Sequence, residues 1–271
     1  MGALVYWKLP PTITFSDLEL AAEIVFGGKA PPTPMSPSAA LRLMIEREWV
    51  RERYSRGEAL VKPVRMMNAS DAFAVVPREG TADNIMYKQE YAVGITGNPP
   101  QLVFTDNCTP MMRETLRANY PRYLKTLSSI ELSHWMVRVC REQLSGFSMN
   151  KSGVYFIPPE GVKLWRELKM CLEVHGVAMH EIPAVRCDQA LEALVDGLKD
   201  FIATANRELY DEYEERLAAG KTTQQRVKAA RAKELQERLD VIAKYEELFG
   251  VGLEAIREDT TKLNVLYAGL A

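Results

Sequence analysis

The stretches DQALEALVDGLKDFIATANRELYDEYEERL (residues 188–217) and QQRVKAARAKELQERLDVIAKYEELF (residues 224–249) decide the layout of the C-terminal part of the chain. Apolar residues recur in both at intervals of three and four, which predicts two amphipathic helices, each with one apolar stripe. Between them, Gly220 can end the first helix and Thr222 or Thr223 can cap the second. The arms are nearly equal in length, so we expect an antiparallel hairpin roughly 40 Å long.

Charges near the tip of this hairpin favour the pairing. Residues 207–217 carry five acids against two arginines, a net charge of −3, whereas residues 221–233 carry five basic residues and no acid. Opposite charges on facing helices select their register and orientation. Three interpretations stay open: both stretches are solvated helix faces, part of the basic stretch contacts phosphate or an acidic partner, or the stretches form a dimer seam.

The second helix also carries an apolar stripe that the first helix can cover on one side only. The stripe predicts a homodimer or larger homo-oligomer with the arm in the interface, because uncovered apolar surface of this kind marks a partner. In the alternative, the arm folds back and buries the stripe within one chain. The predicted interface residues are Val227, Leu235, Leu239 and Ile242.

Composition sets limits on the class of protein. The chain has 271 residues, 47% hydrophobic, with a net charge of −2, so neither nucleic acid nor a membrane attracts the whole molecule. No stretch is long and apolar enough for a transmembrane helix, and the N-terminus lacks the features of a signal peptide. The four cysteines are scattered and form no CxxC, which indicates free thiols in a reducing compartment. We expect a cytoplasmic protein.

The first 107 residues read as an α+β domain. Four strand-like runs with short turns follow two helices, and this order favours an antiparallel meander over a parallel sheet. The predicted fold class is therefore α+β, with an antiparallel-sheet domain, a helical middle and a long helical hairpin. The predicted domains are 1–107, 108–187 and 188–271.

Residues 108–187 read as three helices, a short β-hairpin, a further helix and a strand. Three helices followed by a hairpin, here over residues 111–157, is the order of a winged-helix module. In the alternative, the hairpin is the edge of an ordinary sheet continued by residues 177–185. Residues 111–157 carry seven basic and three acidic residues, a net charge of +4. The basic residues are candidates for nucleic-acid binding: Arg113, Arg117, Arg122, Lys125, Arg138, Arg141 and Lys151.

Sets of catalytic residues are scarce. The three histidines, His134, His175 and His180, lie in none of the patterns that nucleophilic, zinc-dependent or deaminase chemistry needs. We therefore predict no catalytic residues, no metal site and no cofactor, and we keep a cryptic metal-dependent nuclease or hydrolase as an alternative.

The opening Val5-Tyr6-Trp7, the proline-rich loop at residues 27–34 and the segment SGVYFIP (152–158) ahead of a helix resemble a group of uncharacterised proteins encoded by bacteriophages and by bacteria or archaea. The resemblance implies a phage or prokaryotic cytoplasmic setting and brings no catalytic residues. With the arm and the local basic segments, it leads us to expect a non-enzymatic binding or assembly protein. That protein is associated with nucleic acid or acts in phage–host conflict; a purely protein-directed adaptor or oligomeric scaffold is the alternative.

Overall fold

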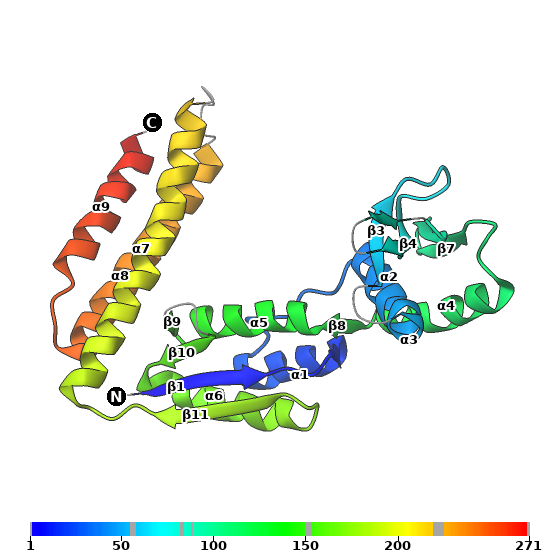
Figure 1. The fold of residues 1–271 in the computed structure, drawn as a ribbon. Helices are drawn as coiled ribbons and strands as arrows, with labels where there is room; N and C mark the ends of the chain where they lie inside the picture. The colour runs from blue at the N-terminus through cyan, green and yellow to red at the C-terminus, as the bar shows by residue number, and fades with distance from the viewer. Residues whose placement is uncertain are drawn as a thin grey trace. The chain divides into compact units, whose positions relative to one another are not determined.

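The computed structural model describes residues 2–54, 58–81, 84–87, 89–149, 153–218 and 225–269 (Figure 1). Antiparallel sheets and helices alternate along the chain, which confirms the predicted α+β class. The chain forms two compact units. The terminal unit combines Met1–Lys8, Val137–Glu173 and Val177–Ala271, and the middle unit combines Leu9–Met136 with Val174–Gly176. The predicted boundaries at residues 107 and 187 stay a prediction about separately folding domains.

The middle unit contains a short two-stranded ladder and a larger sheet. Its helical elements are α1 (Phe15–Phe26), α2 (Pro37–Ile45), the π-helix η1 (Glu46–Val50), α3 (Arg51–Arg53) and α4 (Pro110–Tyr123), followed by the start of α5 (Ser129–Glu142). Its strands are β2 (Thr12–Thr14), β3 (Ala59–Val64), β4 (Asp71–Thr81), β5 (Asn84–Tyr87), β6 (Tyr91–Thr96), β7 (Gln101–Phe104) and β8 (Thr126–Ser128).

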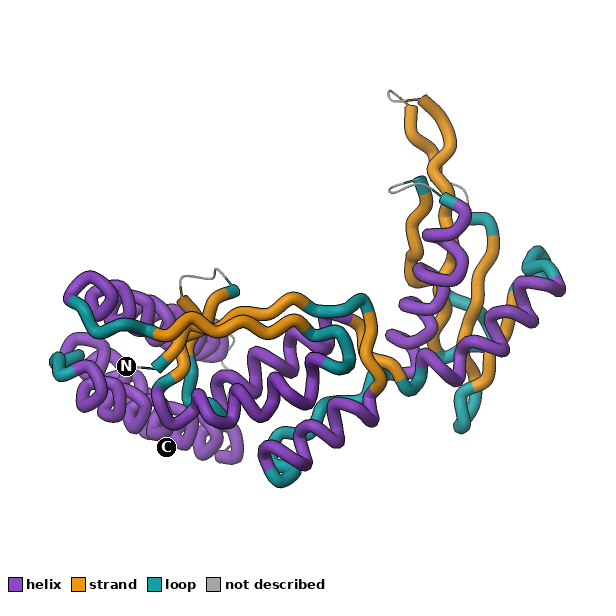
Figure 2. Tube along the Cα trace, turned by 90° about the horizontal axis from the view of Figure 1, so that it is seen from below, coloured by secondary structure: helices purple, strands orange, loops and turns teal. Residues whose placement is uncertain are grey.

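The larger sheet of the middle unit has the strand order β3-β4-β6-β7, with β5 paired to the far part of β4. Consecutive pairing of this kind is the antiparallel meander expected from the short turns. Helices α2 and α4 pack on each other, and α2 lies against β4 and β6 (Figure 2). Both helices begin with a proline that directly follows an N-cap residue. The side-chain hydroxyls of the N-cap residues Ser36 and Thr109 accept hydrogen bonds from the backbone N–H groups of Ala39 and Met112.

The terminal unit is built on a four-stranded antiparallel sheet. Its strands, in the order β11-β1-β10-β9, are β11 (Ala178–Pro183), β1 (Ala3–Lys8), β10 (Val154–Ile157) and β9 (Phe147–Met149). The N-terminal strand thus pairs with two strands that follow it by about 150 residues or more. The β9–β10 hairpin forms the edge of this sheet, which is the second of the two interpretations given above. Strand β1 lies between the hairpin and β11.

Helix α6 (Pro159–Glu173) covers one face of this sheet, where Trp165 is fully buried and lies near Trp7. On the other face, Phe147 and Phe156 pack against α7 (Asp188–Ala218) and α8 (Gln225–Phe249). The predicted pair of long helices is therefore present. It is not a bare hairpin, because α9 (Glu254–Gly269) packs along both helices and makes a three-helix bundle (Figure 1).

Candidate functional site

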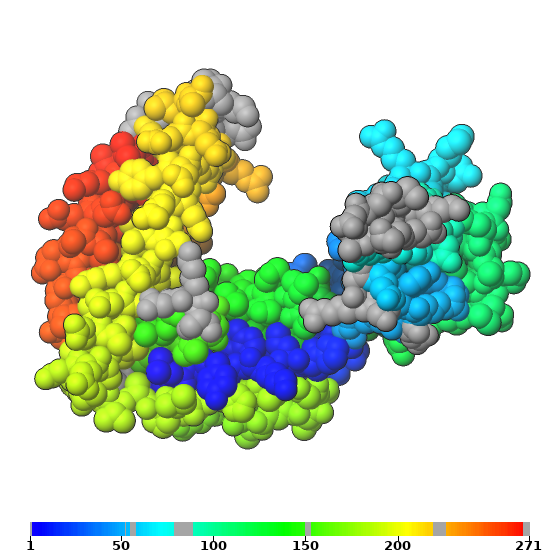
Figure 3. Space-filling view, in the orientation of Figure 1, coloured from blue at the N-terminus to red at the C-terminus, as the bar shows by residue number. Residues whose placement is uncertain are grey.

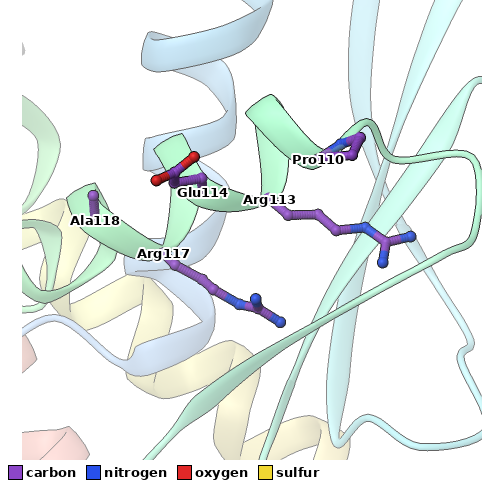
Figure 4. A pocket seen from close by; sticks show the side chains of 5 residues that line it. All are labelled: Pro110, Arg113, Glu114, Arg117 and Ala118. Atoms are coloured by element: carbon purple, nitrogen blue, oxygen red, sulfur yellow. The ribbon is translucent and has the colours of Figure 1, made fainter.

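Arg113 and Arg117 lie on α4 of the middle unit and extend to the same side of the helix, whereas Glu114 points away (Figure 4). The Arg113 guanidinium donates to the backbone oxygens of Cys108 and Thr105, each at 3.0 Å, and of Asp106 at 3.3 Å. It therefore holds the loop after β7 against α4. The Arg117 guanidinium lies 5.1 Å from the ring centroid of Phe104. A shallow hollow of about 610 Å³ lies here, lined by the two arginines and by Pro110, Glu114 and Ala118.

Arg122 is engaged with a carboxylate, Glu48. Arg122 Nη2 lies 2.6 Å from Glu48 Oε1, and Glu48 also accepts from the hydroxyl of Tyr123 at 2.7 Å and from Asn119 at 3.4 Å. Glu48 lies on the π-helix η1. Lys125, another of the predicted basic residues, is exposed just after the end of α4. Burial, followed by the hydrogen bond to Glu48, raises the pKa of the Tyr123 hydroxyl. Arg122 thus belongs to a structural polar cluster.

The remaining predicted basic residues belong to the terminal unit. Arg138 is half-buried on α5. Lys151 lies outside the described residues. Arg141 is exposed, and its guanidinium lies 5.2 Å from the ring centroid of Phe201 on α7. The structure therefore joins Arg113 with Arg117 in the middle unit, and it places Arg141 beside residues of α7 and α8 that the sequence analysis did not select.

Arg141 lines a polar groove of about 870 Å³ that runs over α7 and α8, here called the arginine groove. The hydroxyls of Ser148 and Thr204 also line it. Its charged residues are four arginines, Arg141, Arg207, Arg231 and Arg238, and four acids, Asp200, Glu208, Glu212 and Glu234. The lining is therefore electrically balanced, which suits a partner carrying both charge signs better than a polyanion.

The inner part of the groove is a network of paired charges. Arg231 bridges Glu212 at 2.6 Å and Glu234 at 2.7 Å, and Arg238 donates to Glu234 at 3.1 Å. Burial lowers the pKa of Arg238. Burial also opposes the charged form of Arg231, but its hydrogen bond to Glu234 and its attraction to both acids outweigh this and raise its pKa. These side chains fix α7 against α8 and are not free to bind a ligand.

The outer part of the groove offers unpaired charges. Arg141, Asp200, Arg207 and Glu208 are exposed, and within the described part of the chain none of them forms an ion pair shorter than 4 Å. Asp200, Thr204 and Arg207 follow one another at intervals of four and three, which puts them on one face of α7. On α8, Arg231, Glu234 and Arg238 follow one another at intervals of three and four, and this pattern was the signal in the sequence that could have identified the groove.

The stripe predicted to form an oligomer interface is largely covered within the chain. Leu235 is fully buried against Leu209, Leu263 and Tyr267, and Ile242 is fully buried in the cluster of α7, α8 and the sheet. Val227 and Leu239 are half-buried, and Leu239 packs against the Ile242 cluster. The premise that this stripe has only one covering helix is wrong, because α9 supplies the second.

No group of three or more His, Cys, Asp or Glu side chains among the described residues is arranged to hold a metal ion. In the same part of the chain, no helix has the length and apolar character needed to cross a membrane.

The model of a family of unknown function, DUF6744, matches residues 1–271. The chain belongs to this family. Membership over the whole length agrees with the expected resemblance to an uncharacterised family. No curated protein and no solved structure matches the chain.

Proposed function

We propose that this member of DUF6744 is a non-enzymatic binding and assembly protein whose arginine groove takes a protein segment carrying both acidic and basic side chains. The observation that supports this most directly is the outer part of the groove, where Arg141 and Arg207 stand beside Asp200 and Glu208 without ion pairs among the described residues. A partner with charges of both signs can pair with all four, and complementary charges give such an interface its specificity.

The basic residues selected from the sequence give less support to a dedicated nucleic-acid surface. Arg113 donates to backbone carbonyls and Arg122 to Glu48, so neither can turn to phosphate without losing these bonds. The setting we propose is the cytoplasm of a prokaryotic cell, with the gene carried by the host or by a phage. The alternative of a metal-dependent nuclease or hydrolase gains no metal-binding cluster from the part of the chain that the structure describes.

Selection from a displayed library of random peptides tests the groove. Selected peptides are expected to carry acidic and basic residues together. Their binding is expected to fall by at least about tenfold in the double variant Arg141→Ser/Arg207→Ser, since each charged contact is worth on the order of 1 kcal/mol or more. The matched control is Lys199→Ser/Lys233→Ser, which removes two exposed cations outside the groove.

Two outcomes contradict the proposal. In one, the selected peptides bind the groove variant as tightly as the unaltered protein. In the other, duplex DNA displaces the peptides, and the binding of this DNA weakens steeply as the salt concentration is raised. Such a slope is the mark of phosphate contacts and would favour a nucleic-acid interface in the groove.

A further inference from the structure

One half of the sheet face in the terminal unit is left open. Residues directly opposite each other in an antiparallel pair share a face, so Tyr6 and His180 lie side by side on the face to which Leu4 also belongs. Leu4 packs against the cluster under α7 and α8, and Met149 on the edge strand β9 lies against Gly197 of α7. Helix α7 therefore covers the β9 end of this face.

The half formed by β1 and β11 is exposed. Tyr6 is 39% and Ile182 51% exposed, and His180 and Lys8 are exposed as well; these four residues are here called the open sheet face. In Figure 3 the N-terminal segment, in dark blue, reaches the surface over much of its length. Solvent-facing positions of an antiparallel sheet are normally polar, so an aromatic residue and an isoleucine here are exceptions.

The two rings of the open sheet face are already arranged as a stack. Their centroids are 4.6 Å apart and their planes differ by 20°. Within the described part of the chain, neither the Tyr6 hydroxyl nor the His180 imidazole has a hydrogen-bond partner. The two rings thus shield each other's inner faces, and a further ring can extend the stack on an outer face, while their polar edges remain free for a ligand.

The sheet places one cation beside this pair. Lys8 lies two residues beyond Tyr6 on the same face, and it has no ion pair among the described residues. The four strands contain one acid, Glu181, which lies on the opposite face beside Val5. There it is bound by Arg166 through two contacts of 2.6 and 3.0 Å. No carboxylate of the sheet therefore opposes an anion at the open face.

We propose that the open sheet face binds single-stranded nucleic acid, with a base stacked on the Tyr6–His180 pair and a neighbouring phosphate near Lys8. Stacked rings beside a cation match a base and its phosphate. Bases inside a duplex are already stacked and paired, whereas those of a single strand are available. This binding is a second activity, independent of the arginine groove.

Fluorescence anisotropy with labelled single strands of about twelve nucleotides, as DNA and as RNA, tests the proposal at low salt. Tyr6→Leu keeps an apolar side chain but removes the ring, and it is expected to weaken binding by about tenfold. Tyr6→Phe keeps the ring and is expected to bind within about twofold of the unaltered protein. Tyr6 is 39% exposed, so circular dichroism should show unchanged folding for both variants.

An abasic strand of the same length separates stacking from simple attraction to phosphate, and it is expected to bind much more weakly. The proposal fails if neither single strand binds. It also fails if the abasic strand or a duplex binds as well as the single strand, or if Tyr6→Leu has no effect. Arg141→Ser/Arg207→Ser should leave single-strand binding intact, so a failure here is distinct from a failure of the groove proposal.

Discussion

Arg238 of α8 donates from Nη1 to the side-chain oxygen of Asn206 of α7 over 2.6 Å, and Asn206 is only 1% exposed. The amide nitrogen of Asn206 then donates to Asp259 at 2.8 Å and to Thr260 at 3.0 Å on α9. One buried amide thus uses its acceptor and both donors to join three helices. Any slip of α9 along the pair would leave these polar groups unpaired in the bundle.

Asn206→Ala is therefore expected to lower the free energy of unfolding by about 2–4 kcal/mol, because it leaves Arg238 and Thr260 without this partner inside the bundle. Urea denaturation followed by circular dichroism measures the change. Gln236→Ala is the control: it removes one exposed hydrogen bond to Asp240 and should change the stability by less than about 0.5 kcal/mol. Equal effects of the two substitutions would refute the role given to Asn206.

Substitutions of Arg113 and Arg117 give a second comparison between a variant and its control. Arg113→Ala removes donors from three backbone carbonyls and is expected to destabilise the protein by about 1–2 kcal/mol. Arg117→Ala removes an exposed side chain whose guanidinium lies over the ring of Phe104, and we expect less than about 1 kcal/mol. Thermal unfolding of the two variants checks this order. A reversed order would contradict the role given to Arg113 in holding the loop after β7.

Stability is expected to fall in alkali because of Tyr120. Its hydroxyl donates to the backbone oxygen of Pro37, and burial raises its pKa to about 12. An unfolded tyrosine titrates near pH 10. Between these two values the unfolded chain binds fewer protons than the native one, so the stability is full below about pH 10 and declines as the pH rises towards 12.

Tyr120→Phe should make this alkaline decline shallower, by up to about 1.4 kcal/mol per pH unit. Melting temperatures measured across that range for both proteins give the comparison. Parallel curves would show that Tyr120 does not set the alkaline limit.

Local patterns predicted the long helices well, since the apolar stripes of α7 and α8 can be recognised from the spacing of neighbouring residues. The placement of β1 between β10 and β11 could not be predicted, because a strand six residues long gives no sign of partners that follow it by about 150 residues or more. The arginine groove was missed because its charges come from three elements. Counting net charge over one segment favoured Arg113 and Arg122, whose donors are used inside the fold.

Self-association through the bundle stays a prediction, and its test needs residues that lie outside the core of the bundle. Leu239 packs within the chain, so Leu239→Asp would unfold the bundle whether or not an oligomer exists. Val265 and Leu217 are 64% and 65% exposed on α9 and α7 and can be replaced without opening the core. If the bundle forms the interface, Val265→Asp or Leu217→Asp should convert a dimer or larger oligomer into monomers with unchanged helical content.

Light scattering at high micromolar concentration measures the change in mass. Ile182→Asp, on the open sheet face, is the control and should leave the oligomer intact. A monomeric unaltered protein would rule the prediction out. Dissociation by Ile182→Asp alone would move the interface to the sheet. It would also mean that a second copy competes with nucleic acid for Tyr6 and His180, because all three side chains share that face.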